Sequence, residues 1–199
     1  MIHYYESHFQ QILLCELEEC LKVVRSSEVT DQNKAETVLM GAHQWHLIRR
    51  PTKKDIIINT LSETRLWDGK YVDFEDVYRA VVDTIGHLEQ VGPLTCYDVA
   101  KRIAYCCGIE PKRYVYLQRG ARVGAMRLLN LSRLSNYCME TSHFEAILPG
   151  LSALHIENFL CIMKDNFNAG KVNEESEIRL NLSKLRCTNR CGNKNLENC

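Results

Sequence analysis

The chain lacks a long apolar run, and no stretch approaches the roughly 18 residues that a membrane-spanning helix needs. Its first residues, MIHYYESHFQQILLCELEE, have no basic leader and soon become acidic, so we recognise no secretory signal peptide. We therefore expect a cytoplasmic protein that does not bind membranes. We also find no internal repeat and no convincing alternation of apolar and polar residues, which argues against long exposed strands.

Helical periodicity, by contrast, is present along most of the chain. Apolar residues at helical spacing predict an amphipathic helix over 8–24, and Thr30 or Asp31 can cap a second helix. Thr52, with Asp55 three residues later, has the spacing of a capping box and predicts a third. Asp73 can cap a helix whose buried stripe includes Phe74. Further helices are predicted from Thr95 to a terminator at Gly108, over 119–131, and from 151 or 152 to 167. The predicted fold class is all-α.

A chain of 199 residues is long enough for one well-buried domain. We predict a single helical domain over 1–167 and a polar, loosely held tail over 168–199, where large apolar side chains become rare. Seven of the ten cysteines lie among apolar residues in helix-like segments, which predicts reduced thiols that pack as small hydrophobic groups. The other three are in the tail.

The formal net charge of zero hides an asymmetry along the chain. Residues 55–90 hold eight acids and three bases, whereas residues 91–133 hold eight bases and two acids. Such a charge separation is typical of a surface that binds a polyanion, with a solvated surface as the alternative.

The basic segment begins at a short corner, LEQVGPLT, between two predicted helices. A short hairpin of this kind exposes the first backbone N–H groups of the second helix, which are positively polarised and suit a phosphate oxygen. Gly92 has no Cβ to obstruct a ligand, and Pro93 fixes the turn. Lys101 and Arg102 follow about two helical turns later and are expected to add positive charge. Contacts of this type hold the DNA backbone without reading sequence.

The corner resembles the helix-hairpin-helix motif, L-P-G-V-G-x-x-T-A-x-x-I, of the endonuclease III-like DNA glycosylase superfamily. The matching residues are Leu88, Val91, Gly92, Pro93, Thr95, Ala100 and Ile103. Gln90 stands where the motif has its first glycine. The wider stretch, GPLTCYDVAKRIAYCCGIEPKRYVYLQRGARVGA, is also similar to uncharacterised bacterial proteins with a GPLTVYDTA and VYLHAGTR pattern. The resemblance implies a helix-hairpin-helix over about 74–107. The DNA-binding residues that we predict are Val91, Gly92, Leu94, Thr95, Lys101, Arg102, Arg119 and Arg122.

The catalytic positions of the superfamily hold other residues in this sequence. Leu94 stands at the position of the lysine that bifunctional glycosylases use, and Tyr116 stands at the position of their aspartate. Leucine cannot form a Schiff base, and tyrosine cannot stabilise an oxocarbenium ion as a carboxylate does. Asp98 and Tyr116 are the substitute catalytic candidates. For Asp98 the alternative role is to form a capping box with Thr95.

Other motifs give additional predictions. His43 and His46 are one helical turn apart, but no carboxylate or cysteine completes a metal site. Cys187, Cys191 and Cys199 resemble the iron-sulfur loop of some glycosylases, with three cysteines in place of four, so an iron-sulfur cluster or zinc ion at these residues is an alternative to no cofactor. Gly120 and Gly124 form a G-x-x-x-G that predicts close helix packing. In ILPGLSALHIENFL, the LPG matches the first half of the hairpin motif, but Ser152 replaces its second glycine and predicts a capped packing helix.

Two functions stay open at this stage. One is a helix-hairpin-helix DNA-binding protein that acts in DNA repair as a hydrolase, a DNA N-glycosylase that removes a damaged or modified base. The other is a non-catalytic DNA-binding or scaffold module that has lost the glycosylase active site. Both make DNA the partner, mainly through its phosphates.

Overall fold

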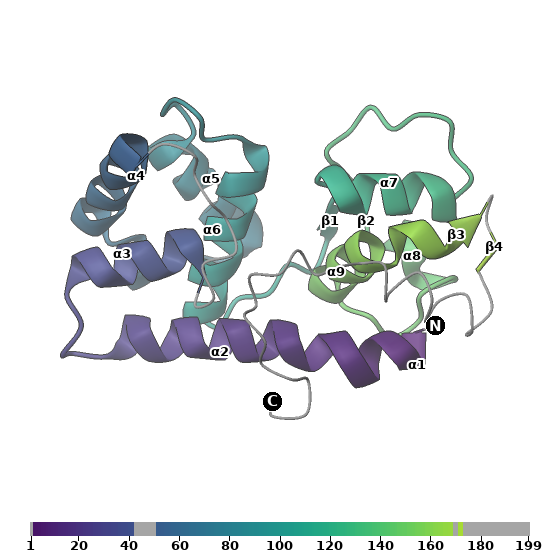
Figure 1. The fold of residues 1–199 in the computed structure, drawn as a ribbon, viewed down its shortest axis with the longest axis horizontal. Helices are drawn as coiled ribbons and strands as arrows, with labels where there is room; N and C mark the ends of the chain where they lie inside the picture. The colour runs from purple at the N-terminus through teal and green to yellow at the C-terminus, as the bar shows by residue number, and fades with distance from the viewer. Residues whose placement is uncertain (1, 42–50, 169–170, 173–199) are drawn as a thin grey trace. The chain divides into compact units, whose positions relative to one another are not determined.

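A computed structural model describes residues 2–41, 51–168 and 171–172 (Figure 1). The chain divides into two compact units, which we call the central unit, residues 12–110, and the terminal unit, residues 1–11 with 111–199. The sequence prediction of one helical domain over 1–167 did not anticipate this division. The described residues are mostly helical, which confirms the coarse prediction of an all-α protein.

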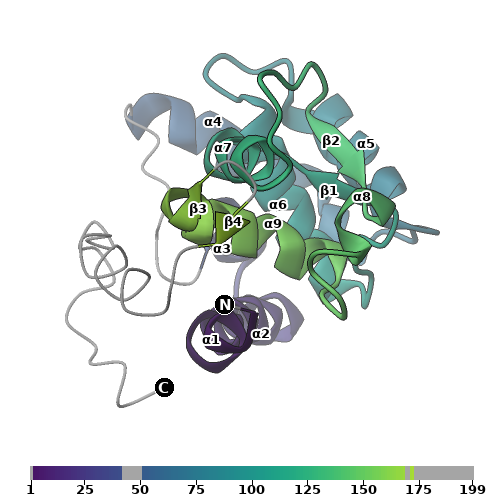
Figure 2. The same cartoon turned by 90° about the vertical axis from the view of Figure 1, so that its right-hand side faces the viewer.

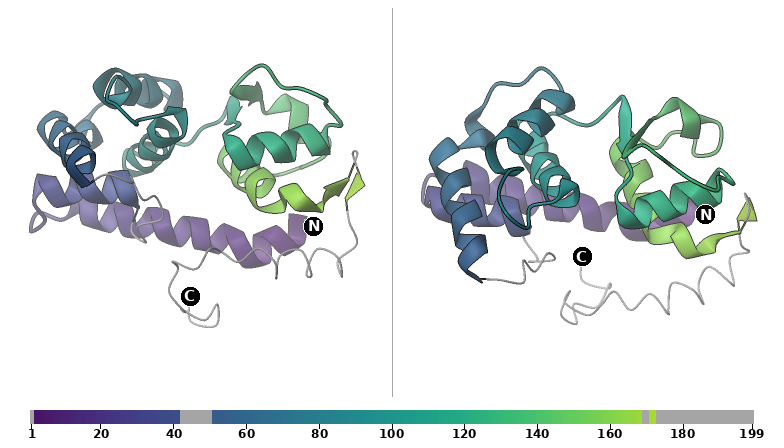
Figure 3. Two further views of the ribbon diagram at one scale, coloured as in Figure 1. Left: turned by 45° about the horizontal axis from the view of Figure 1, so that its top comes forward. Right: turned by 90° about the horizontal axis from the view of Figure 1, so that it is seen from above.

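The central unit consists of helices. In chain order they are α2 (Gln11–Arg25), α3 (Asp31–Met40), α4 (Pro51–Thr64), the 3₁₀ turn η2 (Leu66–Asp68), α5 (Phe74–Ile85) and α6 (Pro93–Cys106). In Figure 1, α3 lies beside α4 and α5 beside α6, and both pairs are in contact. Figure 3 shows the same helices from two further directions.

Side-chain caps define the starts of two of these helices. Thr30 Oγ1 accepts a hydrogen bond from the Asn33 amide at 3.3 Å, and Asp73 Oδ1 accepts one from the Asp76 amide at 2.9 Å. These bonds satisfy amide groups that have no acceptor inside the helix. Both caps were predicted. The predicted cap at Thr52 is wrong, since α4 already begins at Pro51.

Most of the apolar stripe predicted for α5 faces the core of the central unit, although Val82, also placed in that stripe, is exposed. In α5, Phe74, Val77, Val81 and Ile85 are at most 1% exposed, as expected for positions that recur every three or four residues. After α6, Gly108 has φ +73 and lies where the sequence predicted the helix to end.

The terminal unit combines short helices with two small sheets. Its elements are α1 (Ile2–Tyr5), the π-helical η1 (Glu6–Gln10), β1 (Tyr114–Tyr116), α7 (Arg119–Leu128), β2 (Cys138–Glu140), α8 (Ser142–Glu145), α9 (Ala153–Met163), the 3₁₀ turn η3 (Lys164–Asn166), β3 (Phe167–Asn168) and β4 (Lys171–Val172). Strand β1 pairs antiparallel with β2, and β3 with β4. The sequence predicted no strands, and it extended the helices from 119 and 151 too far.

Helices α7 and α9 lie side by side in the core of the terminal unit (Figure 2). The predicted G-x-x-x-G explains their close approach. A Cβ built on Gly120 would lie 2.6 Å from the Cys161 sulfur, and one on Gly124 would collide with the Leu160 carbonyl oxygen. The prediction that these glycines allow close packing is confirmed.

The seven cysteines of the described residues are all free thiols. Cys20, Cys96 and Cys106 are buried, and the other four are half-buried. Burial raises the pKa of the Cys96 thiol above its ordinary value. Among 2–41, 51–168 and 171–172, no helix is long and apolar enough to cross a membrane.

Candidate nucleic-acid interface

The residues between α5 and α6, which we call the first corner (Gly86–Gly92), form a compact hydrogen-bonded turn. The Leu88 amide donates to the Ile85 carbonyl at 3.0 Å, and the Val91 amide donates to the Leu88 carbonyl at 3.1 Å. Gln90 has φ +74, in the left-handed region that favours glycine. The backbone at Gln90 thus has a conformation that suits the glycine of the motif, although the side chain is a glutamine.

Helix α6 begins directly after the first corner. Gly92 is its N-cap residue and Pro93 its first helical residue, so the amides of Leu94 and Thr95 lie in the first turn, where the helix itself offers no acceptor. A Cβ built on Gly92 would meet no heavy atom of the described residues within 4 Å. Val91, Gly92, Leu94 and Thr95 are each partly exposed. The start of α6 is therefore open to a small group such as a phosphate oxygen.

The predicted capping box of Thr95 and Asp98 is wrong, because the N-cap is Gly92 and Thr95 lies within the first turn. Asp98 is 6% exposed, and its Oδ1 lies 3.4 Å from the Lys101 ammonium group. The Lys101 side chain is 11% exposed and also lies over the Tyr97 ring, 5.5 Å from its centre. These contacts direct the Lys101 charge toward the protein.

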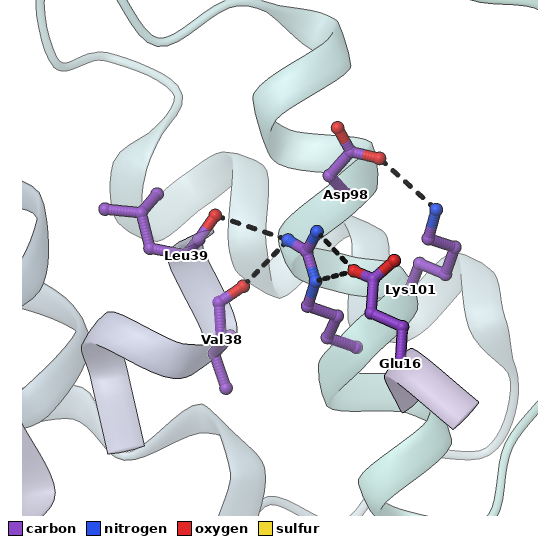
Figure 4. A network of polar contacts seen from close by, with 6 residues as sticks. Glu16, Val38, Leu39, Asp98 and Lys101 are labelled. Carbon is purple, nitrogen blue, oxygen red and sulfur yellow. Dashed lines mark hydrogen bonds and ion pairs between the residues drawn. The ribbon is translucent and has the colours of Figure 1, made fainter. Parts of the chain in front are cut away.

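Arg102 does not reach solvent, which corrects its predicted role as a phosphate contact. The residue is 1% exposed. Figure 4 labels Glu16, Val38 and Leu39, whose oxygens accept its hydrogen bonds. Its Nε and Nη2 donate to Glu16 Oε1 at 3.2 and 3.0 Å, and its Nη1 donates to the Val38 and Leu39 carbonyls at 3.1 and 3.2 Å. Arg102 therefore joins α6 to α2 and to the C-terminal end of α3.

The network also explains the glycine that ends α3. Gly41 has φ +74, and a Cβ there would lie 2.6 Å from Glu16 Oε1 and 2.8 Å from Arg102 Nη2. A buried Arg–Glu pair is stable only when its remaining polar groups are satisfied, and here the Val38 and Leu39 carbonyls of α3 accept from Nη1. The guanidinium group of Arg102 thus stabilises the packing of α6 against α2 and α3.

The two substitute catalytic candidates are both buried. Tyr116 is 8% exposed in β1, opposite Cys138 of β2, and it belongs to the terminal unit. Asp98 belongs to the central unit and is held beside Lys101. Two neighbouring tyrosines also have packing roles: Tyr97 is 1% exposed in an edge-to-face contact with Phe74, and Tyr114 is partly covered by Arg113. The described structure gives neither candidate an open approach for a substrate.

The remaining predicted DNA contacts, Arg119 and Arg122, lie on α7 of the terminal unit. Arg119 is the first residue of that helix. Arg122 is half-buried, its Nη2 donates to the Leu134 carbonyl, and its guanidinium carbon lies 5.5 Å from the centre of the Tyr137 ring. Tyr137 is 60% exposed, so this pair lies at the surface of the terminal unit.

A second corner (Ala146–Ser152), between α8 and α9, shares a positive φ and one turn hydrogen bond with the first corner, at residue numbers higher by 60. Gly150 has φ +83 where Gln90 has +74, and the Leu151 amide donates to the Leu148 carbonyl as Val91 does to Leu88. Ser152, the N-cap of α9, corresponds to Gly92, and its side chain makes no capping hydrogen bond. Ser152 is thus at the predicted N-cap position, but the capping hydrogen bond expected from its side chain does not form. The sequence LPG, which ends at Gly150, is the local feature that indicates this second corner.

The predicted metal ligands lie outside the described residues, both His43 with His46 and Cys187, Cys191 and Cys199. Within the part of the chain that the structure describes, no group of three or more histidines, cysteines or acids is arranged to hold a metal ion.

Comparison of the chain with protein-family models, with curated proteins and with solved structures gives no match.

Proposed function

We propose that the protein binds DNA through the first corner and the start of α6, as a helix-hairpin-helix module. One observation carries the proposal: Gln90 has the left-handed φ of +74 that suits the first glycine of the motif, directly before the open N-cap Gly92. A non-glycine residue pays a conformational cost of about 1 kcal/mol or more there, so the turn is imposed by its surroundings.

The binding mode follows from the groups at the start of α6. A phosphate oxygen at Gly92 accepts hydrogen bonds from the amides of Leu94 and Thr95, at the positive end of a helix of 14 residues. No side chain at Gly92 obstructs the approach. Because these donors are backbone groups, they hold the DNA without selecting a base sequence.

Burial favours the non-catalytic form of the proposal. Leu94 lacks the amine of the bifunctional glycosylases, and Asp98 and Tyr116 are at most 8% exposed. Base excision by this chain stays a prediction, and it is tested by incubating the protein with duplexes that carry damaged or modified bases. We expect no abasic sites; if they appear and persist in Asp98→Asn, the chemistry belongs to a residue other than Asp98.

Substitution of Gly92 tests the DNA contact separately from folding. Both Gly92→Asn and Gly92→Asp supply a good N-cap side chain, so both variants should be at least as stable as the wild type. Only the aspartate adds a negative charge where the phosphate binds. We expect Gly92→Asp to bind a labelled duplex about fivefold or more weakly than Gly92→Asn, equivalent to about 1 kcal/mol of charge repulsion.

The measurement is fluorescence anisotropy at low salt, with thermal unfolding of both variants as the control for folding. Both side chains can accept hydrogen bonds from the Leu94 and Thr95 amides, so DNA affinity of Gly92→Asn and Gly92→Asp equal to that of the wild type would refute a phosphate contact at the first corner. Absence of binding by the wild-type protein to any duplex would refute the proposal as a whole.

A further inference from the structure

The central unit contains a cavity of about 690 Å³ on the side of α3 where that helix begins. Four segments line it: the end of α2 with the loop that follows, the first residues of α3, the segment from Arg65 to Asp68, and Cys106 at the end of α6. Its volume is within the range of small-molecule sites. None of these segments belongs to the proposed DNA contact.

Positive charge exceeds negative charge on the cavity lining. The charged residues are Arg25, Asp31, Lys34, Arg65 and Asp68. Arg65 lies between the two acids, with its Nη2 2.7 Å from Asp68 Oδ2 and its Nε 3.6 Å from Asp31 Oδ2. No carboxylate of the described residues lies within ion-pair distance of Arg25 or Lys34. The two acids thus share one cation. Arg25 Nη2 donates to the Cys106 carbonyl at 3.4 Å, which leaves the charges of Arg25 and Lys34 on the lining without a carboxylate partner among the described residues.

Arg65 has a backbone conformation that is unusual for a residue other than glycine. Arg65 directly follows α4 and has φ +48, at a position where glycine is the usual residue. An arginine in this conformation is strained, and its guanidinium group is what holds Asp31 and Asp68.

The lining also contains uncharged groups. The cavity includes Thr30 and Asp31, so the positive end of α3 is part of its wall. Trp67 also lines it and is 5% exposed, and its indole Nε1 has no hydrogen-bond acceptor among the residues that the structure describes. The Nε1 atom itself is buried, so the indole ring forms part of the cavity wall and its N–H group is not open to a ligand.

We propose that this cavity binds a small phosphomonoester. The phosphate group, with several acceptor oxygens and up to two negative charges, suits Arg25 and Lys34 together with the start of α3. The cavity is much larger than a phosphate ion, so the organic part of the ligand also lies inside it. Hydroxyl groups on that part can donate to Asp31 and Asp68. The inference is independent of the DNA contact at Gly92.

Titration with ribose 5-phosphate, inorganic phosphate and ribose tests the proposal on the full chain. We expect ribose 5-phosphate to bind most tightly, inorganic phosphate more weakly, and ribose not measurably, by isothermal titration calorimetry. Lys34→Gln and Arg25→Gln should each weaken the binding of ribose 5-phosphate at least tenfold. Lys22→Gln removes the same charge from α2 outside this cavity and should leave the affinity unchanged.

The indole N–H signal of Trp67 in a nitrogen–proton correlation spectrum reports on the cavity directly, and Trp67→Phe identifies the signal. It should shift on addition of ribose 5-phosphate in the wild type and in Gly92→Asp. No binding of either phosphate compound overturns the proposal, as does binding that Lys22→Gln weakens as much as Lys34→Gln does. Acetate binding as tightly as ribose 5-phosphate would replace the phosphomonoester by a carboxylate.

Discussion

Gln90 and Gly150 occupy corresponding positions in two similar corners, with φ values of +74 and +83. In the first corner the Val91 amide donates to the Leu88 carbonyl at 3.1 Å. In the second corner the Leu151 amide donates to the Leu148 carbonyl at 3.4 Å. The turn thus forms with glutamine as well as with glycine at the position of positive φ.

This relationship predicts opposite effects of two substitutions on stability. Gln90→Gly removes the strain of a left-handed glutamine, and we expect the free energy of unfolding to rise by about 0.5–1 kcal/mol. Gly150→Ala introduces the corresponding strain and should lower it by about 1–2 kcal/mol. Urea unfolding followed by circular dichroism measures both. A loss of stability in Gln90→Gly would show that the glutamine side chain contributes more than its conformation costs.

The buried Arg102–Glu16 pair predicts a large and asymmetric response to substitution. Arg102→Met leaves the Glu16 carboxylate buried without its partner and two carbonyls of α3 without donors, so the free energy of unfolding should fall by about 3–5 kcal/mol. The double variant Arg102→Met with Glu16→Leu removes both charges and should recover part of that loss.

Urea unfolding of the two single variants and the double variant measures the coupling between the two side chains. Arg79→Met is the control, because Arg79 is exposed and its pair with Asp76 lies at the surface, where it contributes little. If Arg102→Met costs less than about 1 kcal/mol, the charge of Arg102 is not required for the fold.

How far the sequence predicted this structure depends on the distance along the chain over which each feature acts. The caps at Thr30 and Asp73 and the stripe of α5 follow from bonds and contacts within a few residues, and they were predicted. The strands β1 and β2 have three residues each, too few for an alternating pattern, and their pairing is set by the fold.

The same reason explains the error at Arg102. Its place in the basic segment indicated a surface charge, but its partner Glu16 is 86 residues away in the sequence. Lys101, the next residue, is held by Asp98. A charge count along the chain cannot separate a basic surface from basic residues that face acids inside the protein. The cavity residues Arg25, Lys34 and Arg65 likewise come from separate segments and share no local motif.

Burial of Tyr5 predicts a loss of stability at high pH. Burial raises the pKa of the Tyr5 phenol well above its ordinary value of 10.0, against the opposing effect of the Asn158 hydrogen bond. Above about pH 10 the unfolded chain releases this proton while the folded chain keeps it, so the unfolded state is favoured as the pH rises. The stabilising contribution of the neutral phenol is complete below pH 10.

Tyr5→Phe isolates this effect. The variant should be less stable at neutral pH, because the 3.0 Å hydrogen bond from Asn158 Nδ2 is lost. Above pH 10 its stability should fall less steeply than that of the wild type, by a difference that approaches about 1.4 kcal/mol per pH unit. Parallel stability curves for the two proteins between pH 10 and 11 would show that the phenol ionises in the folded state as easily as in the unfolded state.

The proposed DNA contact predicts a weak dependence of affinity on salt. The slope of log affinity against log salt is about −0.9 for each phosphate that a basic side chain neutralises. At the first corner the donors are amides, Arg102 is buried, and Lys101 is held beside Asp98 with 11% of its side chain exposed. We therefore expect a slope of magnitude below about 2, in contrast to proteins that bind many phosphates through basic side chains.

Anisotropy titrations of a labelled duplex at several salt concentrations measure this slope, and Lys101→Gln should change it by less than about 1. Arg102 is unsuitable for the same test because its loss affects folding. A slope steeper than about −5 that also persists in Gly92→Asp would assign binding to exposed basic side chains. A shallow slope, with loss of affinity in Gly92→Asn and a larger loss in Gly92→Asp, is the result expected if backbone amides at the start of α6 hold the phosphate, because either N-cap side chain occupies those amides and only the aspartate adds a negative charge.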